Sequence, residues 1–227
     1  MEKVAYLDLL AQYEINSAHP GGMALTRELL RRETITSNTT VLDVGCGTGQ
    51  TSSFIARRYP CQVVAIDINP RMLEKARQKF SQSNLKIPVF RADAADLPFR
   101  KNSFDLVLAE SVTVFTNNIR RTLREYYRVL KPGGTLLAIE GTALLPLTAA
   151  EEKDLRSMLG IACLPTKDQW RQMLQEAGFR NIQVLFQQRM SWLGSFPPEL
   201  AGVFSEYRRT MFRNRNKFGF GVYRCQL

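Results

Sequence analysis

The chain has little of what a metal site or a disulfide framework needs. Its 227 residues include one histidine and four cysteines, and no two cysteines stand at the spacing of zinc ligands. We therefore expect no metal site. Without a disulfide framework or an apolar leader, we expect a reducing, cytoplasmic environment. No run of about 20 apolar residues occurs, so we expect no membrane span.

Acidic residues are the second shortage, and it is strongest near the carboxyl end. The chain has 31 lysines and arginines against 21 aspartates and glutamates, which gives a formal net charge of +10. Residues 205–227 hold a single acid, Glu206. Such a stretch is either a solvated helix face or a patch that meets phosphates and other anions. Its basic residues are Arg208, Arg209, Arg213, Arg215, Lys217 and Arg224.

Apolar residues, at 44% of the chain, are sufficient for one domain with a full core. Short apolar runs alternate with helical patterns, which predicts an α/β fold with a mostly parallel sheet and helices on both faces. We expect a helical N-terminal cap over 1–40, a core over 41–140, and a substrate-side insert and edge over 141–227. The expected strands are 41–44, 61–66, 87–90, 104–109, 135–140, 181–186 and 218–225, the last two pairing antiparallel.

The core is organised around a glycine-rich turn between a strand and a helix, in the sequence VLDVGCGTGQ over 41–50. Glycine lets a ligand approach the backbone closely, and such a turn directs N–H groups toward that ligand. Acids stand at or just after the ends of four predicted strands. Because ligands of open α/β sheets bind outside the carboxyl ends of the strands, these acids should converge. They are Asp43, Asp67, Asp93 and Glu110.

Asp67 is the candidate ribose ligand, because a carboxylate at the end of the second strand accepts hydrogen bonds from ribose hydroxyls. The alternative is that Asp67 caps the helix expected to begin at Pro70. The glycine spacing is G-x-G-x-G, and Gln50 occupies the position of the third glycine in the dinucleotide pattern G-x-G-x-x-G. No lysine and serine or threonine follow the glycines, which excludes a P-loop.

Several further motifs follow the turn in a fixed order. They are DVGCGTG (43–49), Asp67, Asp93-Ala94, FDLV (104–107), RVLKPGG (128–134) and EAGF (176–179). Together they resemble the class I S-adenosylmethionine-dependent methyltransferases, in particular their small-molecule branch. The close resemblance covers about residues 41–140. It implies a Rossmann-like three-layer sandwich with a seven-stranded sheet, an antiparallel last strand, and S-adenosylmethionine as cofactor, with S-adenosylhomocysteine as product.

The resemblance also implies roles for the residues of the turn. The backbone around Gly45, Cys46, Gly47 and Gly49 would hold the methionine moiety of the cofactor. Asp43 would lie near the amino group of that moiety.

For the nucleoside, the resemblance assigns the ribose to Asp67 and places Ile68 against the adenine. Asp93 would bond the adenine amino group, and the N–H of Ala94 a ring nitrogen. Glu110 would stand near the methionine end and the methyl group. From the residues alone, Asp93 is equally readable as a turn acid.

No residue is marked by the sequence as the catalytic group. Methyl transfer mainly requires that the acceptor lie in line with the methyl–sulfur bond, and it needs a base only if the acceptor loses a proton early. His19 is a candidate base or substrate contact, against an ordinary loop histidine. Tyr13 is a candidate substrate contact, against a core aromatic. Glu110 is a candidate for orienting the acceptor.

The favoured partner is a small-molecule methyl acceptor, for a chain that acts as a monomer or homodimer. The first alternative is an RNA acceptor held by the basic C-terminal stretch. Residues 110–113 read ESVT where base-amino methyltransferases carry a run like Asn-Pro-Pro-Tyr, which disfavours that reading. The others are a non-catalytic cofactor-binding protein and an NAD-dependent oxidoreductase, the latter set back by the glycine spacing.

Overall fold

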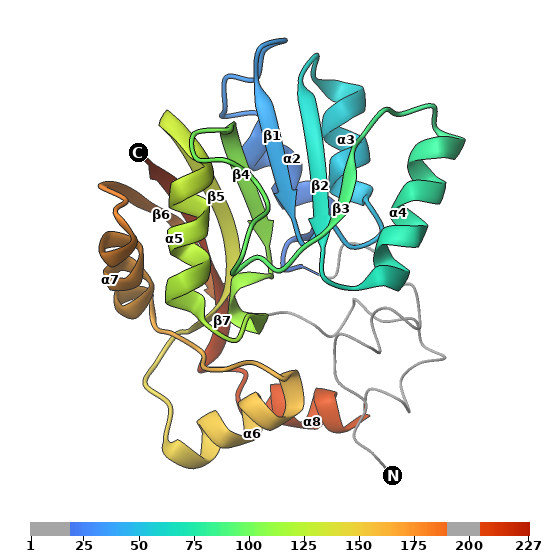
Figure 1. Ribbon diagram of the computed structural model, residues 1–227. Coiled ribbons are helices and arrows are strands. Elements are labelled where there is room, and N and C mark those ends of the chain that lie inside the picture. Colours follow the sequence, from blue (N-terminus) through green and yellow to red (C-terminus); the bar gives the residue numbers. More distant parts are fainter. Residues whose placement is uncertain (1–18, 190–204) are drawn as a thin grey trace.

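The computed structural model describes residues 19–189 and 205–227 of the chain. Within these residues it is a seven-stranded sheet in the order β3-β2-β1-β4-β5-β7-β6 (Figure 1). The strands are β1 (Thr40–Val44), β2 (Gln62–Asp67), β3 (Val89–Arg91), β4 (Phe104–Glu110), β5 (Leu130–Ala143), β6 (Asn181–Arg189) and β7 (Phe218–Gln226).

The pairing of these strands confirms the predicted α/β fold. The pairs β1–β2, β2–β3, β1–β4 and β4–β5 are parallel. The last strand, β7, is antiparallel to both of its neighbours, β5 and β6. It therefore inserts between them, and β6 forms the edge of the sheet.

Two strands differ in length from the sequence prediction. β3 begins at Val89 and not at Ile87, because Pro88 has no N–H with which to join the ladder. β5 extends to Ala143, beyond the predicted end at Glu140. The reason is its antiparallel partner, which continues the pairing as far as Ala143 opposite Phe218. A parallel neighbour alone could not have specified this extension.

Helices cover both faces of the sheet, as their apolar sides require (Figure 1). Buried side chains of α2, α3 and α4 pack on one face, and those of α5 and α7 on the other. The helices are α2 (Gly22–Leu30), α3 (Gln50–Arg58), α4 (Pro70–Gln82), α5 (Ile119–Val129), α6 (Ala149–Leu159), α7 (Lys167–Ala177) and α8 (Ser205–Arg213), with a 3₁₀ turn, η1 (Thr113–Phe115).

Some sequence predictions fall outside the described residues. These are the helix expected near the N-terminus, Tyr13, and the beginning of the basic helix before residue 205. Among the helices that are described, not one combines the length and apolar character needed to cross a bilayer. In the same residues, histidine, cysteine and acidic side chains form no group of three placed to hold a metal ion.

Candidate functional site

The sheet brings the predicted acids to one edge. β3, β2, β1 and β4 lie side by side and parallel, so their carboxyl ends share that edge. Asp43 lies in β1, Asp67 and Glu110 end β2 and β4, and Asp93 follows β3 closely. The topological argument from the sequence is therefore confirmed for the strands that carry these acids.

The glycine turn between β1 and α3 is tightly enclosed on two sides. Gly45, with φ 65°, would place a Cβ 2.4 Å from Val112 Cγ2, and Gly49, with φ 77°, would place one 2.5 Å from the ring of Phe80. At Gly47 an added Cβ would meet no atom within 4 Å. The turn thus leaves its backbone accessible at Gly47, where a ligand can approach closely.

Asp67 is hydrogen-bonded to this turn. Its Oδ2 accepts the N–H of Gly47 at 2.9 Å, and its Oδ1 accepts the N–H of Asn69 at 2.8 Å. Burial raises the pKa of Asp67, and these hydrogen bonds oppose that effect. The cap of α4 is Asn69, whose side chain accepts N–H bonds from the first turn of that helix. Asp67 is therefore available for a ligand and is not the helix cap.

Asp43 lies beneath the turn and not at its surface. It is 2% exposed, and its carboxylate accepts a short hydrogen bond from the hydroxyl of Ser52 in α3. Burial raises its pKa to about 7; the Ser52 bond opposes this shift, and the charges of Glu110 and Asp67 add to it. In this arrangement Asp43 ties β1 to α3. Cys46 is also buried, and burial raises its thiol pKa, so at this residue the backbone is the candidate ligand contact.

The predicted adenine residues lie in two short loops at the same edge. Ile68, directly after β2, is 56% exposed although it is large and apolar. Asp93 is exposed, and its Oδ1 accepts the N–H of Ala95 at 2.8 Å, which stabilises a tight turn. Ala94 is buried beside it. An exposed aliphatic side chain and an exposed acid provide a stacking surface and a hydrogen-bond acceptor for a planar base.

Glu110 is the centre of a buried polar cluster that sequence reasoning found only in part. Thr26 Oγ1 donates to its Oε1 at 2.5 Å, and Thr51 Oγ1 donates to its Oε2 at 2.8 Å. His19 Nε2 lies 3.5 Å from Oε2, and the two side chains are 5% and 7% exposed. The structure therefore unites His19 with Glu110, as the two candidate catalytic residues. Thr26 and Thr51 carried no recognisable signal in the sequence.

The surroundings of His19 restrict what it can do. Its Nδ1 lies 3.2 Å from the carbonyl oxygen of Pro20, and its Nε2 faces Glu110 and the Thr26 hydroxyl. Because Thr26 donates its proton to Glu110, it can only accept from His19. Each ring nitrogen thus faces an acceptor, so the imidazole must turn before it can take a proton from a substrate.

The chain bends sharply after Glu110. Ser111 adopts φ 57°, a conformation that is rare outside glycine, and its N–H donates to Ile139 at 2.7 Å. Backbone strain of this kind concentrates at functional sites, where the surrounding structure holds it in place. The bend directs Val112 toward the glycine turn, where it contacts the position beside Gly45.

A second buried acid, Glu140 in β5, holds the segment after this bend. It is fully buried and accepts the N–H groups of Val112 at 3.3 Å, Thr113 at 2.9 Å and Val114 at 3.3 Å. Burial raises its pKa to about 7, against the effect of these bonds. Sequence reasoning missed Glu140. The available signal was an acid at the end of the apolar strand TLLAIE (135–140).

The basic C-terminal stretch is partly neutralised in the fold. Lys217 pairs with Glu151 at 2.8 Å, and Arg224 makes a two-pronged pair with Glu33 through bonds of 2.7 and 2.9 Å. Arg215 lies over the ring of Phe212 and bonds its carbonyl oxygen. Three of the six basic residues therefore have local structural partners.

A parallel sheet with a glycine turn after β1 and an acid at the end of β2 defines the class of Rossmann-like, nucleoside-binding enzymes. Comparison with known proteins narrows this class. The profile described as a methyltransferase domain matches residues 41–134. An uncharacterised methyltransferase of Bacillus subtilis, YodH, is 37% identical over 181 residues, which cover 79% of this chain and 76% of that protein.

Solved structures share the fold at lower identity. The [4+2] cyclase SpnF superposes with a TM-score of 0.77 at 22% identity and covers 97% of this chain and 92% of its own. A phosphoethanolamine N-methyltransferase of Haemonchus contortus, solved with phosphomonomethylethanolamine and S-adenosylhomocysteine, superposes with a TM-score of 0.80 at 19% identity, over 97% of this chain and 57% of its own.

The chain belongs to the class I S-adenosylmethionine-dependent methyltransferases. The family resemblance read from the motifs is thereby confirmed, and with it the enzyme class and the cofactor of that class. The likeness to a cyclase shows that this fold also serves other chemistry, so the acceptor must be argued from the site.

Proposed function

We propose that the chain transfers a methyl group from S-adenosylmethionine to a small-molecule acceptor by in-line displacement. The observation that carries the proposal is the contact between Asp67 and Gly47, beside the accessible backbone at Gly47. It joins a ribose-binding acid to a turn that tolerates close approach of a ligand. The phosphomonomethylethanolamine bound to the Haemonchus contortus enzyme supports a small acceptor.

We assign the cofactor contacts as follows. Each carboxylate oxygen of Asp67 accepts one N–H and retains a second lone pair, which can accept a ribose hydroxyl. Ile68 would cover one face of the adenine, and Asp93 with the N–H of Ala94 would bond its edge. The backbone of Gly45, Cys46, Gly47 and Gly49 would hold the methionine moiety, with Asp43 beneath it.

The cofactor supplies an electrophilic methyl group, so the task left to the chain is alignment and exclusion of water. Glu110, fixed by two threonine hydroxyls, would border the methyl group and orient the acceptor. His19 would close the site over Glu110 and act as a base only after its ring turns. Tyr13 remains a proposed substrate contact.

Two measurements test this proposal in sequence. First, S-adenosylhomocysteine at about 100 times its dissociation constant should stabilise the protein by ~2.7 kcal/mol in a thermal-shift series, and NAD should not. Second, labelled S-adenosylmethionine is incubated with the protein and a cell extract, which is then separated into small molecules, RNA and protein. Label in the small-molecule fraction supports the proposal.

The other outcomes identify the alternatives. Label in RNA would replace the small acceptor by a nucleic acid bound through the basic C-terminal stretch. Stabilisation without label in any fraction would indicate a cofactor-binding protein that does not transfer methyl groups. A shift with NAD and none with S-adenosylhomocysteine would remove the cofactor assignment itself.

A further inference from the structure

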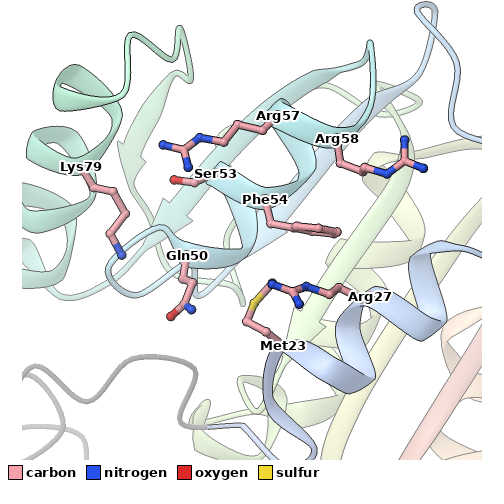
Figure 2. A pocket seen from close by; sticks show the side chains of 8 residues that line it. All are labelled: Met23, Arg27, Gln50, Ser53, Phe54, Arg57, Arg58 and Lys79. Atoms are coloured by element: carbon pink, nitrogen blue, oxygen red, sulfur yellow. The ribbon is translucent and has the colours of Figure 1, made fainter.

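A cavity of about 610 Å³ lies outside the sheet, between α2, α3 and α4 (Figure 2). It opens on the side of α3 that carries Ser53, Phe54 and Arg57, whereas the proposed cofactor contacts lie in the loops at the carboxyl ends of the strands. Its size is that of a site for a small organic molecule. The cavity is therefore separate from the site described above, although both adjoin the start of α3.

The cavity is lined by four cations and no acid. Arg27, Arg57, Arg58 and Lys79 all contribute side chains to it. Their printed neighbours are neutral: Arg57 donates to the Ser83 hydroxyl, Arg27 lies over an aromatic ring, and Lys79 approaches a threonine hydroxyl. In the described part of the chain none of the four cations pairs with a carboxylate. A concave surface of one charge sign attracts and concentrates anions.

Two polar atoms in the same cavity wall have no hydrogen-bond partner. Ser53 is only 7% exposed, and its hydroxyl and the Oε1 of Gln50 are both buried and unsatisfied among the described residues. Figure 2 shows the Ser53 hydroxyl pointing to the side of the cavity bounded by Arg57 and Lys79. Unpaired buried polar groups are uncommon in native proteins and call for a partner.

The chemistry of these groups defines a ligand. An oxyanion would accept the Ser53 proton and charge-assisted bonds from Arg57 and Lys79. Burial lowers the pKa of Lys79, a cost that a bound anion would reverse. The Oε1 of Gln50 needs a donor, which a hydroxyl group of the same ligand supplies.

We propose that the cavity between α2, α3 and α4 binds a small organic phosphate that carries a hydroxyl group. The phosphate lies between Ser53, Arg57 and Lys79, and the hydroxyl donates to Gln50. This second site neither requires nor alters the proposed assignment of the methyl acceptor.

The test uses glycerol 3-phosphate, inorganic phosphate and glycerol as probes, at constant ionic strength in chloride, by titration calorimetry. We expect saturable binding of one glycerol 3-phosphate per chain, weaker binding of inorganic phosphate, and none of glycerol. The double variant Arg57→Gln/Lys79→Gln should bind at least tenfold more weakly, since each lost charge-assisted bond is worth about tenfold. Arg100→Gln/Lys101→Gln, which removes two exposed cations elsewhere, is the matched control.

Ser53→Ala separates a ligand-binding role from a structural one. Removing a buried unpaired hydroxyl should raise the melting temperature of the free protein and, in the same variant, weaken glycerol 3-phosphate binding severalfold. All variants should keep the stabilisation by S-adenosylhomocysteine, which shows that they are folded. A small phosphate that binds equally well to Ser53→Ala and to both double variants would overturn the proposal.

Two further results would also overturn it. An absence of saturable binding to the wild-type protein would show that the cavity has no affinity for such anions. Binding of tRNA that is lost in Arg57→Gln/Lys79→Gln, without binding of glycerol 3-phosphate, would show that the cations serve a nucleic acid.

Discussion

The carboxylate of Asp67 accepts the backbone N–H of Gly47 at 2.9 Å, across 20 residues of sequence. This bond fixes the end of β2 against the glycine turn that follows β1. The acid and the accessible backbone at Gly47 are therefore placed relative to each other before any ligand binds. Such preorganisation lowers the cost of ordering the site on binding.

Asp67→Asn should weaken the binding of S-adenosylhomocysteine by about 10- to 100-fold, because hydrogen bonds to a charged group are worth about 1.5–3 kcal/mol. Titration calorimetry measures the dissociation constant. Asp96→Asn, an exposed acid in the loop after β3, is the control. Unchanged affinity in Asp67→Asn would remove the ribose assignment.

Gly47→Ala should abolish most cofactor binding at a modest cost in stability. Its φ of 54° makes the substitution cost ~1–2 kcal/mol in free energy of unfolding, and its added methyl group would occupy the space open to a ligand. Gly133→Ala is a matched control, since Gly133 has φ 79° and also has no atom within 4 Å of an added Cβ. The two variants should lose similar stability in urea unfolding, and only Gly47→Ala should lose affinity for S-adenosylhomocysteine.

Glu140 should make stability depend on pH. Its pKa rises from 4.5 in the unfolded chain to about 7 in the folded one. The stabilising contribution is therefore complete below pH 4.5 and is lost as the pH rises through 7, by roughly 3 kcal/mol. Glu140→Gln should give a flatter curve of unfolding free energy between pH 5 and pH 8 than the wild type.

The Glu140 experiment has an internal reference. Asp43, whose pKa is also raised to about 7, contributes with the same sign and remains in Glu140→Gln. The variant should therefore keep part of the pH dependence. Identical curves for the wild type and Glu140→Gln would show that Glu140 titrates alike in both states.

His19 and Glu110 should act as a unit in methyl transfer. Their side chains lie 3.5 Å apart in a buried cluster, so His19→Gln and Glu110→Gln should be non-additive. We expect a coupling energy of about 0.5–3 kcal/mol in a double-mutant cycle on the rate of label transfer. Additive effects within ~0.3 kcal/mol would mean that the two residues act independently.

Much of the nucleotide site follows from local patterns. The run VLDV ends in a turn with glycines at 45, 47 and 49, and periodic helices separate the strands, so the sequence places acids at one edge of a parallel sheet. The pairing of β1, β2, β3 and β4 confirms this edge. The reason is that strand and helix periods are short-range properties, and right-handed crossovers restrict how they assemble.

The basic residues near the carboxyl end show where sequence reasoning is weakest. Six charges within 23 residues suggested either a solvated face or an anion-binding patch, but Lys217 and Arg224 pair with Glu151 and Glu33. A concentration of cations instead arises from three separate helices around Ser53. Charge along the chain does not determine charge in space, because partners come from distant segments.

The sequence by itself determined the α/β order of the elements, the glycine turn and the acids at the strand ends, because each depends on residues a few positions apart. Only the tertiary structure decided that Thr26, 84 residues from Glu110, donates to it, and that Glu140 holds the loop after β4. It also decided that Asn69, and not Asp67, caps α4. These contacts depend on how helices pack across a sheet, and side-chain geometry at that range is not encoded in any local pattern.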